Sequence, residues 1–291
     1  MAVYSSYDQI GIAEDVSSII TTISPSDTPF SSLVKSEKVH NRLFEWQEDT
    51  LRAGQANAKV EGAAFAAGTQ TPTVLRSNVT QILNTTFEVS ATADAVKTHG
   101  RAAETAHQLS KVLKEIKKDL EFAYVGVDNA SVAGSSAVAR EMASATQMIT
   151  TDVAVTGALT EAKLLELGED CYNNGSDPSL FMIKPADSLI TAGFASSAGR
   201  NRTFNDGTKS VVNAVDLYIS PFGEYRIILN RHQLTTHAFL IDPSMWRSVV
   251  LRPFSRTLLG KVSDGDTHAV TGEYSLKHMN FDADGMLSAL T

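Results

Sequence analysis

Acidic side chains and a histidine gather near the C-terminal end of the sequence, where they could bind a metal ion. Asp264, Asp266 and His268 alternate along one short segment. Carboxylate and imidazole groups are the usual ligands of metal-dependent hydrolases. The same residue types also populate polar hairpin loops. A polar turn is the simpler interpretation, and a metal-dependent hydrolase is the alternative.

A second pattern in this region has the spacing of a calcium-binding loop. Asn280, Asp282, Asp284 and Gly285 occupy positions 1, 3, 5 and 6 of such a loop. Position 12 should be a bidentate glutamate, and Thr291 stands there instead. Because the strongest ligand is missing, the sequence predicts a turn and no calcium site.

Other catalytic patterns are absent from the sequence. It has no nucleophile elbow, no His-Glu-x-x-His motif, no phosphate-binding loop and no dinucleotide-binding glycine pattern. Cys171 is the only cysteine, so no intrachain disulfide framework can form, which fits a reducing cytoplasm. A lone cysteine in a predicted helix favours a core thiol over a nucleophile. We therefore expect no catalytic residue, no metal and no cofactor.

Composition limits the possible partners. The chain has 291 residues, 43% hydrophobic and 20% charged, enough for a sizeable core in one elaborated domain or two intimate ones. Its net charge is −8 and no Lys/Arg-rich run occurs, which argues against sequence-independent binding to nucleic acid backbones. No apolar run approaches the roughly 18 to 20 residues of a membrane span. The protein could still enclose DNA without binding it.

The elements that would position any site begin with residues 42–89. Residues 42–49 alternate as a half-buried strand, and Thr71–Val89 forms a second strand with apolar residues at odd positions. That second set is Leu75, Val79, Leu83, Phe87 and Val89. Between the strands, the Gly/Ala-rich segment 53–68 offers little to a core. A ribbon reaching about 30 Å is marginally stable alone, so we expect it to lie on another subunit. An ordinary hairpin with a long mobile loop is the alternative.

The clearest helix is predicted over 101–126. Apolar residues recur there at steps of three and four, while charged residues cover the remaining surface. Such a helix is about 39 Å long and needs an equally long surface to lie against. The predicted core residues of this helix are Leu109, Leu113, Ile116 and Leu120.

The rest of the chain is predicted to be mixed. Residues 128–156, rich in Ala, Ser, Gly and Thr, indicate a loop or weakly ordered insertion. Helices are predicted over 160–173 and 185–194. The predicted strands are 179–183, 211–219, 225–230, 238–242 and 246–252, with a final strand pair, 257–261 and 268–280.

This order of elements resembles the tailed-bacteriophage major capsid proteins with the Hong Kong 97-type (Johnson) fold. Three short segments also look similar to capsid proteins of podophage-like and related phages. They are Ser-Asp-Thr-Pro-Phe at 26–30, Phe-Glu-Trp at 44–46 with Asp49, and Val-Thr-Gly-Glu-Tyr-Ser-Leu at 270–276. The resemblance covers nearly the whole chain.

The resemblance implies an α+β fold with five regions. These are an N-terminal arm (1–41), an extended loop with its flanking strands (42–89), a peripheral domain with the long spine helix (90–139), an α/β axial domain (140–255) and return strands of the peripheral domain (256–291). It also implies that the extended loop contacts a neighbouring subunit. The residues expected to do so are Arg52, Lys59, Glu61 and Phe65.

The function implied by the resemblance is that of a structural major capsid protein and not an enzyme. Subunits would assemble as pentamers and hexamers into an icosahedral shell around a double-stranded DNA genome, enclosed but not bound sequence-specifically, with no membrane. Scaffolding and portal proteins would be partners, with decoration proteins as a further option. Assembly would occur in the host cytoplasm, and the protein would end in the virion. An encapsulin-type compartment, which has the same fold, is the alternative.

Overall fold

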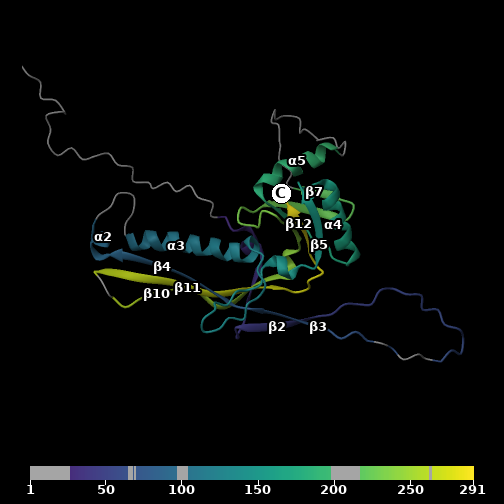
Figure 1. Cartoon of the computed structure of the whole chain (residues 1–291), viewed down its shortest axis with the longest axis horizontal. Coiled ribbons are helices and arrows are strands. Elements are labelled where there is room, and N and C mark those ends of the chain that lie inside the picture. Colours follow the sequence, from purple (N-terminus) through teal and green to yellow (C-terminus); the bar gives the residue numbers. More distant parts are fainter. Residues whose placement is uncertain (1–26, 65–67, 69, 97–103, 198–216, 262–263) are drawn as a thin grey trace, which may run out of the picture.

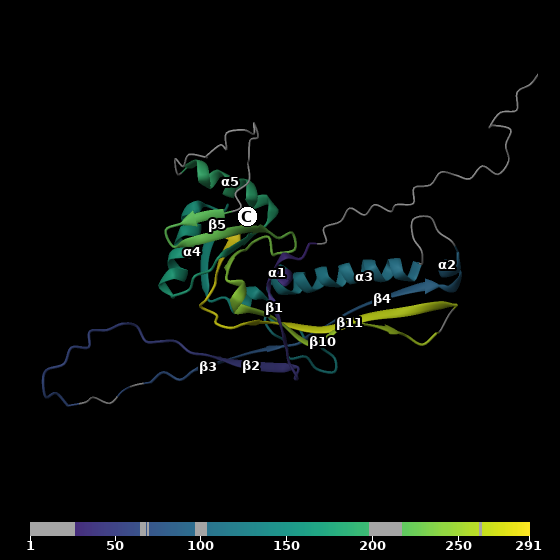
Figure 2. The ribbon, with the colours of Figure 1, turned by 180° about the vertical axis from the view of Figure 1, so that it is seen from behind.

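The computed structural model describes residues 27–64, 68, 70–96, 104–197, 217–261 and 264–291. They form two sheets that meet at a shared core, and a two-stranded ribbon that projects from the side of the four-stranded sheet (Figure 1). Seen from behind, a long helix lies along the four-stranded sheet, and shorter helices surround the six-stranded one (Figure 2). The predicted α+β class is confirmed.

The four-stranded sheet has the order β1-β10-β11-β4. Its strands are β1 (Lys35–Lys38), β10 (Trp246–Leu258), β11 (Gly265–His278) and β4 (Gln81–Ser90). The pair predicted near the C-terminus is therefore the long antiparallel hairpin β10–β11. The two strands predicted over 246–252 and 257–261 form a single strand in the structure, β10, which begins at Trp246. Pro253 cannot donate a ladder hydrogen bond, and the register shifts on both sides of it.

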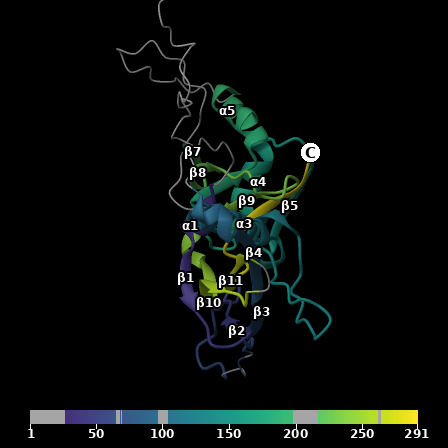
Figure 3. The ribbon, with the colours of Figure 1, turned by 90° about the vertical axis from the view of Figure 1, so that its left-hand side faces the viewer.

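The six-stranded sheet has the order β5-β12-β9-β6-β8-β7. Its strands are β5 (Thr151–Gly157), β12 (Gly285–Leu290), β9 (Ala238–Ile241), β6 (Leu180–Ile183), β8 (Gly223–Leu229) and β7 (Leu217–Ser220). In the end-on view, β1, β10 and β11 lie below the long helix, and this sheet lies above it (Figure 3). The strands predicted over 179–183, 225–230 and 238–242 are confirmed. Of the predicted strand 211–219, residues 211–216 lie outside the described residues.

The two helices beside the six-stranded sheet lie close to the predicted ranges 160–173 and 185–194. Helix α4 (Glu161–Asn173) begins after Thr160, whose hydroxyl oxygen accepts a hydrogen bond from the Lys163 amide at 3.4 Å. It ends before Gly175, whose φ of +83° favours glycine. The helix predicted over 185–194 is a short 3₁₀ turn, Pro185–Asp187, followed by α5 (Ser188–Ser197).

The long helix α3 (Glu104–Glu121) lies on the four-stranded sheet and continues into a π-helical turn, Phe122–Gly126. Residues 101–103 of the prediction lie outside the described residues. Val112, Ile116 and Leu120 are buried. Val112 and Ile116 form a cluster with the sheet against which Leu109 packs, and Leu120 belongs to the core that joins the two sheets. The prediction that Leu113 belongs to this core is wrong, since its side chain is 38% exposed. Leu113 follows Val112 by about 100° around the helix and falls on the flank of the apolar stripe.

The segment predicted as a loop over 128–156 is divided: residues 128–141 are irregular and mostly exposed, as predicted, whereas the part from Met142 onward belongs to the core. Met142, Ala145, Met148 and Ile149 are buried, and a 3₁₀ turn spans Ala145–Met148. Its small residues suggested weak order. They instead let the backbone pass closely between the two sheets, where the Ala143 amide reaches the side chain of Asn78 at 2.9 Å. Strand β5 was also missed here.

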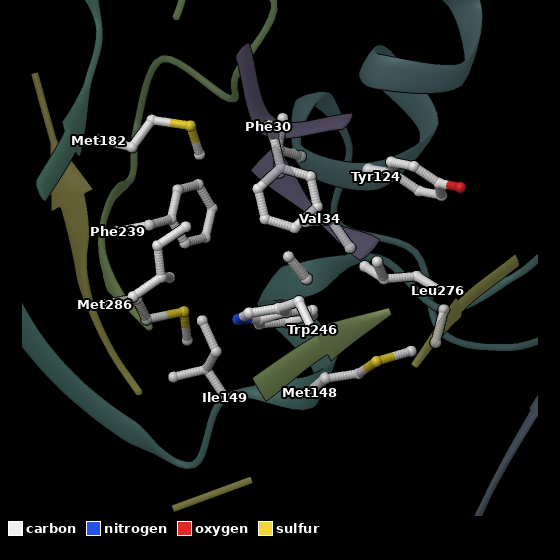
Figure 4. Packing of buried hydrophobic residues seen from close by; sticks show 14 of the residues in the cluster. Phe30, Val34, Tyr124, Met148, Ile149, Met182, Phe239, Trp246, Leu276 and Met286 are labelled. Atoms are coloured by element: carbon white, nitrogen blue, oxygen red, sulfur yellow. The ribbon is translucent and has the colours of Figure 1, made fainter. Parts of the chain in front are cut away.

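One apolar cluster joins the two sheets and the start of the described chain (Figure 4). Phe30 of α1 (Pro29–Leu33) lies at its centre, 1% exposed. Its ring meets Trp246 edge-on at 5.5 Å and Tyr124 at 5.9 Å. Figure 4 shows Met182, Phe239 and Met286 of the six-stranded sheet on the other side of the same ring. The part of the predicted arm from residue 29 onward is therefore built into the fold.

The predicted regions need three changes at their edges. Residues 246–255, placed in the predicted axial domain 140–255, are part of β10 in the four-stranded sheet. Strand β1, in the predicted arm 1–41, pairs in parallel with β10 of the four-stranded sheet. Strand β12, in the predicted return segment 256–291, pairs with β5 and β9 of the six-stranded sheet. The last strand therefore returns to the other sheet. The apolar residues Met286 and Leu287 of β12 are buried, but their sequence pattern does not indicate which sheet the strand joins.

The ribbon is shorter than predicted. Strands β2 (Leu43–Glu48) and β3 (Val74–Val79) pair antiparallel over six residues each. The predicted strand Thr71–Val89 is divided at Thr80, so that β3 belongs to the ribbon and β4 to the four-stranded sheet. Leu83, Phe87 and Val89 face inward as predicted. Leu75 does not, and is 57% exposed, because none of the described elements covers the ribbon there.

The position of Leu113 beside the buried stripe of α3 generates a first prediction. Ile116→Asp places a carboxylate in the core and should lower the free energy of unfolding by several kcal/mol. Leu113→Asp should cost less than about 1 kcal/mol, since that side chain already meets solvent. Urea unfolding of the isolated subunit measures both. Equal losses from the two variants would contradict this placement of the helix.

Cys171 supplies a second prediction. It is fully buried on the inner face of α4, and burial raises the pKa of its thiol to about 12. The folded protein should therefore resist maleimide labelling at about pH 8, because the reactive thiolate is scarce and inaccessible. Labelling should become complete in denaturant. Rapid labelling of the native chain, followed by mass spectrometry, would show instead that α4 opens readily.

Candidate assembly surfaces

The most exposed apolar side chains of the described chain lie on the loop that joins β2 to β3. Leu51 is 98% exposed and Val60 is 82% exposed. Figure 1 shows this loop extending away from the body of the subunit. Apolar groups in such positions contribute nothing to the folding of their own subunit, so the loop is a candidate for contact with another molecule.

The structure describes three of the four loop residues predicted to make this contact. Arg52, Lys59 and Glu61 are all exposed. Phe65 lies outside the described residues. The loop turns tightly at its end, where the Ala63 amide donates to the Val60 carbonyl at 3.0 Å and Gly62 has a φ of +79°. That these residues contact a neighbouring subunit stays a prediction.

A buried carboxylate holds the root of the ribbon, where β3 passes into β4. Glu273 of β11 is 3% exposed. It forms ion pairs with Arg140 and with Arg252, whose Nε lies 3.0 Å from Oε2. The Thr80 hydroxyl donates to Glu273 Oε1 at 2.7 Å, and Arg140 Nε donates to the Thr80 carbonyl at 3.1 Å. These contacts fix the point at which the chain leaves the sheet, and we call them the root node.

A buried amide strengthens the same root from the other side. Asn78, fully buried, donates to the Leu276 carbonyl at 2.7 Å and accepts from the Ala143 amide at 2.9 Å. The Ser275 hydroxyl donates to the Val79 carbonyl at 2.7 Å. Since buried polar groups are costly when unpaired, these contacts favour a single arrangement of the ribbon.

A third contact lies farther along the ribbon. Glu48, at the end of β2, is 8% exposed and accepts from Arg76 Nε at 2.8 Å. Its other oxygen accepts from the Phe281 amide at 3.0 Å. The guanidinium of Arg76 in turn lies 4.2 Å above the centre of the Phe281 ring. The ribbon is therefore fastened to the turn that precedes β12.

The start of the described chain is fastened in a similar way. Glu121, at the end of α3, is fully buried and accepts from the amides of Phe30 and Ser31, both at 2.8 Å. Asn230 Nδ2 donates to the same carboxylate at 2.7 Å. Glu121 thus joins α1, α3 and the residue that follows β8, and it fixes the position of α1 on the body.

The predicted turn at 280–285 is partly confirmed and partly wrong. Asn280 Oδ1 accepts from the Asp282 amide at 3.0 Å, as in a local turn. Asp284, by contrast, is fully buried and accepts from the Asp242 amide and from the Trp246 indole nitrogen. Its Oδ2 lies 2.9 Å from His278 Nε2. Trp246 stacks on the His278 ring at 4.1 Å, so Asp284 is part of the joint between the sheets.

The three candidate ligands of a metal-dependent hydrolase do not come together. Asp264 and Asp266 are exposed, and Asp266 lies 3.6 Å from the Lys261 ammonium. His268 is 6% exposed and packs beside Phe87. Within the described ranges, no three His, Cys, Asp or Glu side chains are grouped closely enough to hold a metal ion. The hydrolase interpretation therefore has no site among these residues.

Groups with perturbed pKa values are scattered through the fold. Burial raises the pKa values of Tyr124 and Cys171, which lie in two different cores. Hydrogen bonds from Gln147 and Thr146 lower the pKa of Asp128. Burial lowers the pKa of His237. Asp128 and His237 also act on each other's pKa, but Tyr124 and Cys171 lie in separate cores, whereas the shifted groups of a catalytic site usually gather in one cleft.

The sequence interpretation missed the root node. A glutamate in the interior of a 14-residue strand was the available signal, because such a carboxylate needs cationic partners. The partners themselves could not be found, since Thr80 is 193 residues away in the sequence and Arg140 is 133. In the part of the chain that the structure describes, no helix has the length and apolar character needed to span a membrane.

The comparisons with known proteins agree on one family. The SU10 major capsid protein family matches residues 3–291. The major capsid protein of Escherichia phage Phieco32 is 30% identical, over 98% of this chain and 96% of that protein.

Solved structures show the same fold. The capsid of cyanophage A-1(L) has a TM-score of 0.72 at 11% identity, covering 96% of this chain and 97% of that one. The SrpI encapsulin of Synechococcus elongatus PCC 7942 has a TM-score of 0.64 at 13% identity, covering 100% of this chain and 96% of that one. At these identities the likeness establishes the fold alone, so the encapsulin does not outweigh the family match. The chain belongs to the SU10 major capsid protein family and has the Hong Kong 97-type fold of tailed-phage capsids.

Proposed function

We propose that this structural capsid protein assembles as pentamers and hexamers into an icosahedral shell that encloses double-stranded DNA. In this proposal, the loop between β2 and β3 makes a principal contact between subunits. The observation that carries the proposal is the exposure of Leu51 and Val60 on a projecting loop. The ribbon packs on its own subunit near its root, but the described loop beyond β2 lies against no other described element, and such an extension is marginally stable alone. Contact with a neighbour would cover these side chains.

The five regions expected from the sequence serve this proposal with amended edges. The four-stranded sheet with α3 would be the peripheral domain, and the six-stranded sheet with α4 and α5 the axial domain. The ribbon and its loop would be the extended loop, and residues before α1 the arm. Arg52, Lys59, Glu61 and Phe65 would contact the neighbour, and Leu109, Ile116 and Leu120 would hold the spine helix on its sheet.

The charge of the chain supports enclosure of DNA without specific binding. The net charge is −8, so a shell built from many copies would repel the phosphate backbone on average. Packaged DNA could then slide during filling. We also propose that the protein has no enzymatic activity. Separate scaffolding and portal proteins would take part in assembly, with decoration proteins as a further option. Assembly would take place in the host cytoplasm, before the virion is released.

The root node gives the loop a defined direction within this proposal. Because Thr80 contacts both Glu273 and Arg140, the ribbon cannot swing without breaking buried polar contacts. A loop with a fixed direction meets its neighbour without a large loss of conformational entropy.

Removal of the loop tests the proposed function. Deleting 53–68 and closing the loop with Asn-Gly removes no described core residue, so helix content and melting temperature of the isolated subunit should be nearly unchanged. Closed shells should be lost, because each subunit loses the same contact. Sedimentation and electron microscopy measure this. Normal shells from the shortened chain would show that the loop is not an assembly element.

The root node generates a separate prediction. Arg140 is 21% exposed at its side chain and also contacts Thr80, so Arg140→Gln should lower the free energy of unfolding by about 2 to 3 kcal/mol. Arg252 is 58% exposed, and Arg252→Gln should cost about 0 to 1 kcal/mol. Urea unfolding compares the matched pair. A larger loss for Arg252→Gln would reverse the assigned roles.

A further inference from the structure

A hollow lies beside the root of the ribbon. It has a volume of about 300 Å³, and its lining includes Arg42, Ile82, Gly134, Val138 and Arg140. Ile82 is 50% exposed and Val138 is 55% exposed, so the hollow presents aliphatic walls to solvent. It is assembled from three parts of the chain: the start of β2, the start of β4 and the segment after α3.

The two arginines of the hollow differ in their partners. Arg140 is engaged by Glu273 and by the Thr80 carbonyl. The backbone carbonyl of Arg42 accepts from the Thr80 amide at 2.8 Å, which fixes its main chain. Its guanidinium is exposed and, within the described residues, has no carboxylate at ion-pair distance. The hollow thus combines aliphatic walls with an available positive charge, which suits an aliphatic side chain next to a carboxylate.

The end of the loop carries that combination. Glu61 is the only acidic residue between positions 50 and 73, and it follows Val60 directly. The hydrogen bond from the Ala63 amide to the Val60 carbonyl and the positive φ of Gly62 hold both residues on a tight turn. Their side chains are therefore presented together on a local structure that forms without a partner.

We propose that the Val60–Glu61 turn of one subunit docks into this hollow on a second copy of the chain. Glu61 pairs there with Arg42, and Val60 packs against Ile82 and Val138. Figures 1 and 2 show the loop extending away from the root, so the turn does not reach the hollow of its own subunit. The inference rests on the proposed function of the loop as a contact between subunits, and it names the surface that receives it.

Charge reversal tests the pairing. Glu61→Arg and Arg42→Glu should each raise the protein concentration needed for shell assembly by about tenfold or more, because the same pair recurs at every copy. The double variant should recover most of the loss, since it restores an opposite pair. Both side chains are exposed, so circular dichroism and melting of the isolated subunits should be unchanged.

Asp49 provides the matched control. It is the other exposed carboxylate near the loop, but it lies directly after β2 and its side chain accepts from the Thr50 amide. Asp49→Arg should leave assembly unchanged. If it lowers assembly as much as Glu61→Arg does, the effect comes from the charge of the loop as a whole and the specific pairing is refuted.

A covalent test gives an independent readout. In assembled shells, the variant with Glu61→Cys and Arg42→Cys should form disulfides between subunits, seen as a ladder on a denaturing gel, while Asp49→Cys with Arg42→Cys should not. Buried Cys171 does not interfere. Shells that form without the ladder, or single reversals that assemble like wild type, overturn this docking while the capsid function stands. A wild-type chain that forms no shells even when its scaffolding protein is supplied overturns both.

Discussion

Glu273 brings a carboxylate into the interior of the four-stranded sheet, and the direction of the ribbon depends on how that charge is satisfied. Two guanidinium groups and one hydroxyl surround it. Removing the Arg140 guanidinium or the Thr80 hydroxyl leaves the buried carboxylate with few alternatives, because water is largely excluded, whereas the more exposed Arg252 matters less. Asn78 and Glu48 add buried contacts on the same ribbon. An element that is weak by itself thus acquires a single direction, and the exposed loop that it carries can serve as a positioned contact surface.

Local signals in the sequence were sufficient for elements that are defined by local chemistry. Thr160 and Gly175 mark the ends of α4, and the alternation around Trp46 identifies β2. Elements that depend on distant partners were harder to predict. Leu113 fits the apolar spacing as well as Val112 does, and only the position of the sheet decides which is buried. Likewise, Thr80 divides the strand predicted over Thr71–Val89 into β3 and β4, because its partners are on β11 and in the segment after α3. Strand β12 joins its sheet by pairing with β5, which lies far away in the sequence.

Solved structures with this fold share few of this chain's residues. The cyanophage capsid is 11% identical with a TM-score of 0.72. An apolar core tolerates such change when volume and pattern are kept. The cluster around Phe30 is of this kind, built from Met, Leu, Ile and aromatic side chains. Polar joints such as Asp284 with Trp246 and His278 require specific partners, so a change of one residue there leaves a buried group unpaired.

The residues of the root node are far apart in the sequence, so the ribosome makes them at different times. Thr80 precedes Glu273 by 193 residues, and at about 5 to 20 residues per second the ribosome needs roughly 10 to 40 s to produce the second after the first. During that interval the ribbon exists without its fastening. A nascent chain therefore carries a loop of undefined direction, and the contact surface matures only when translation has delivered β11. The timing of synthesis itself delays encounters between unfinished subunits.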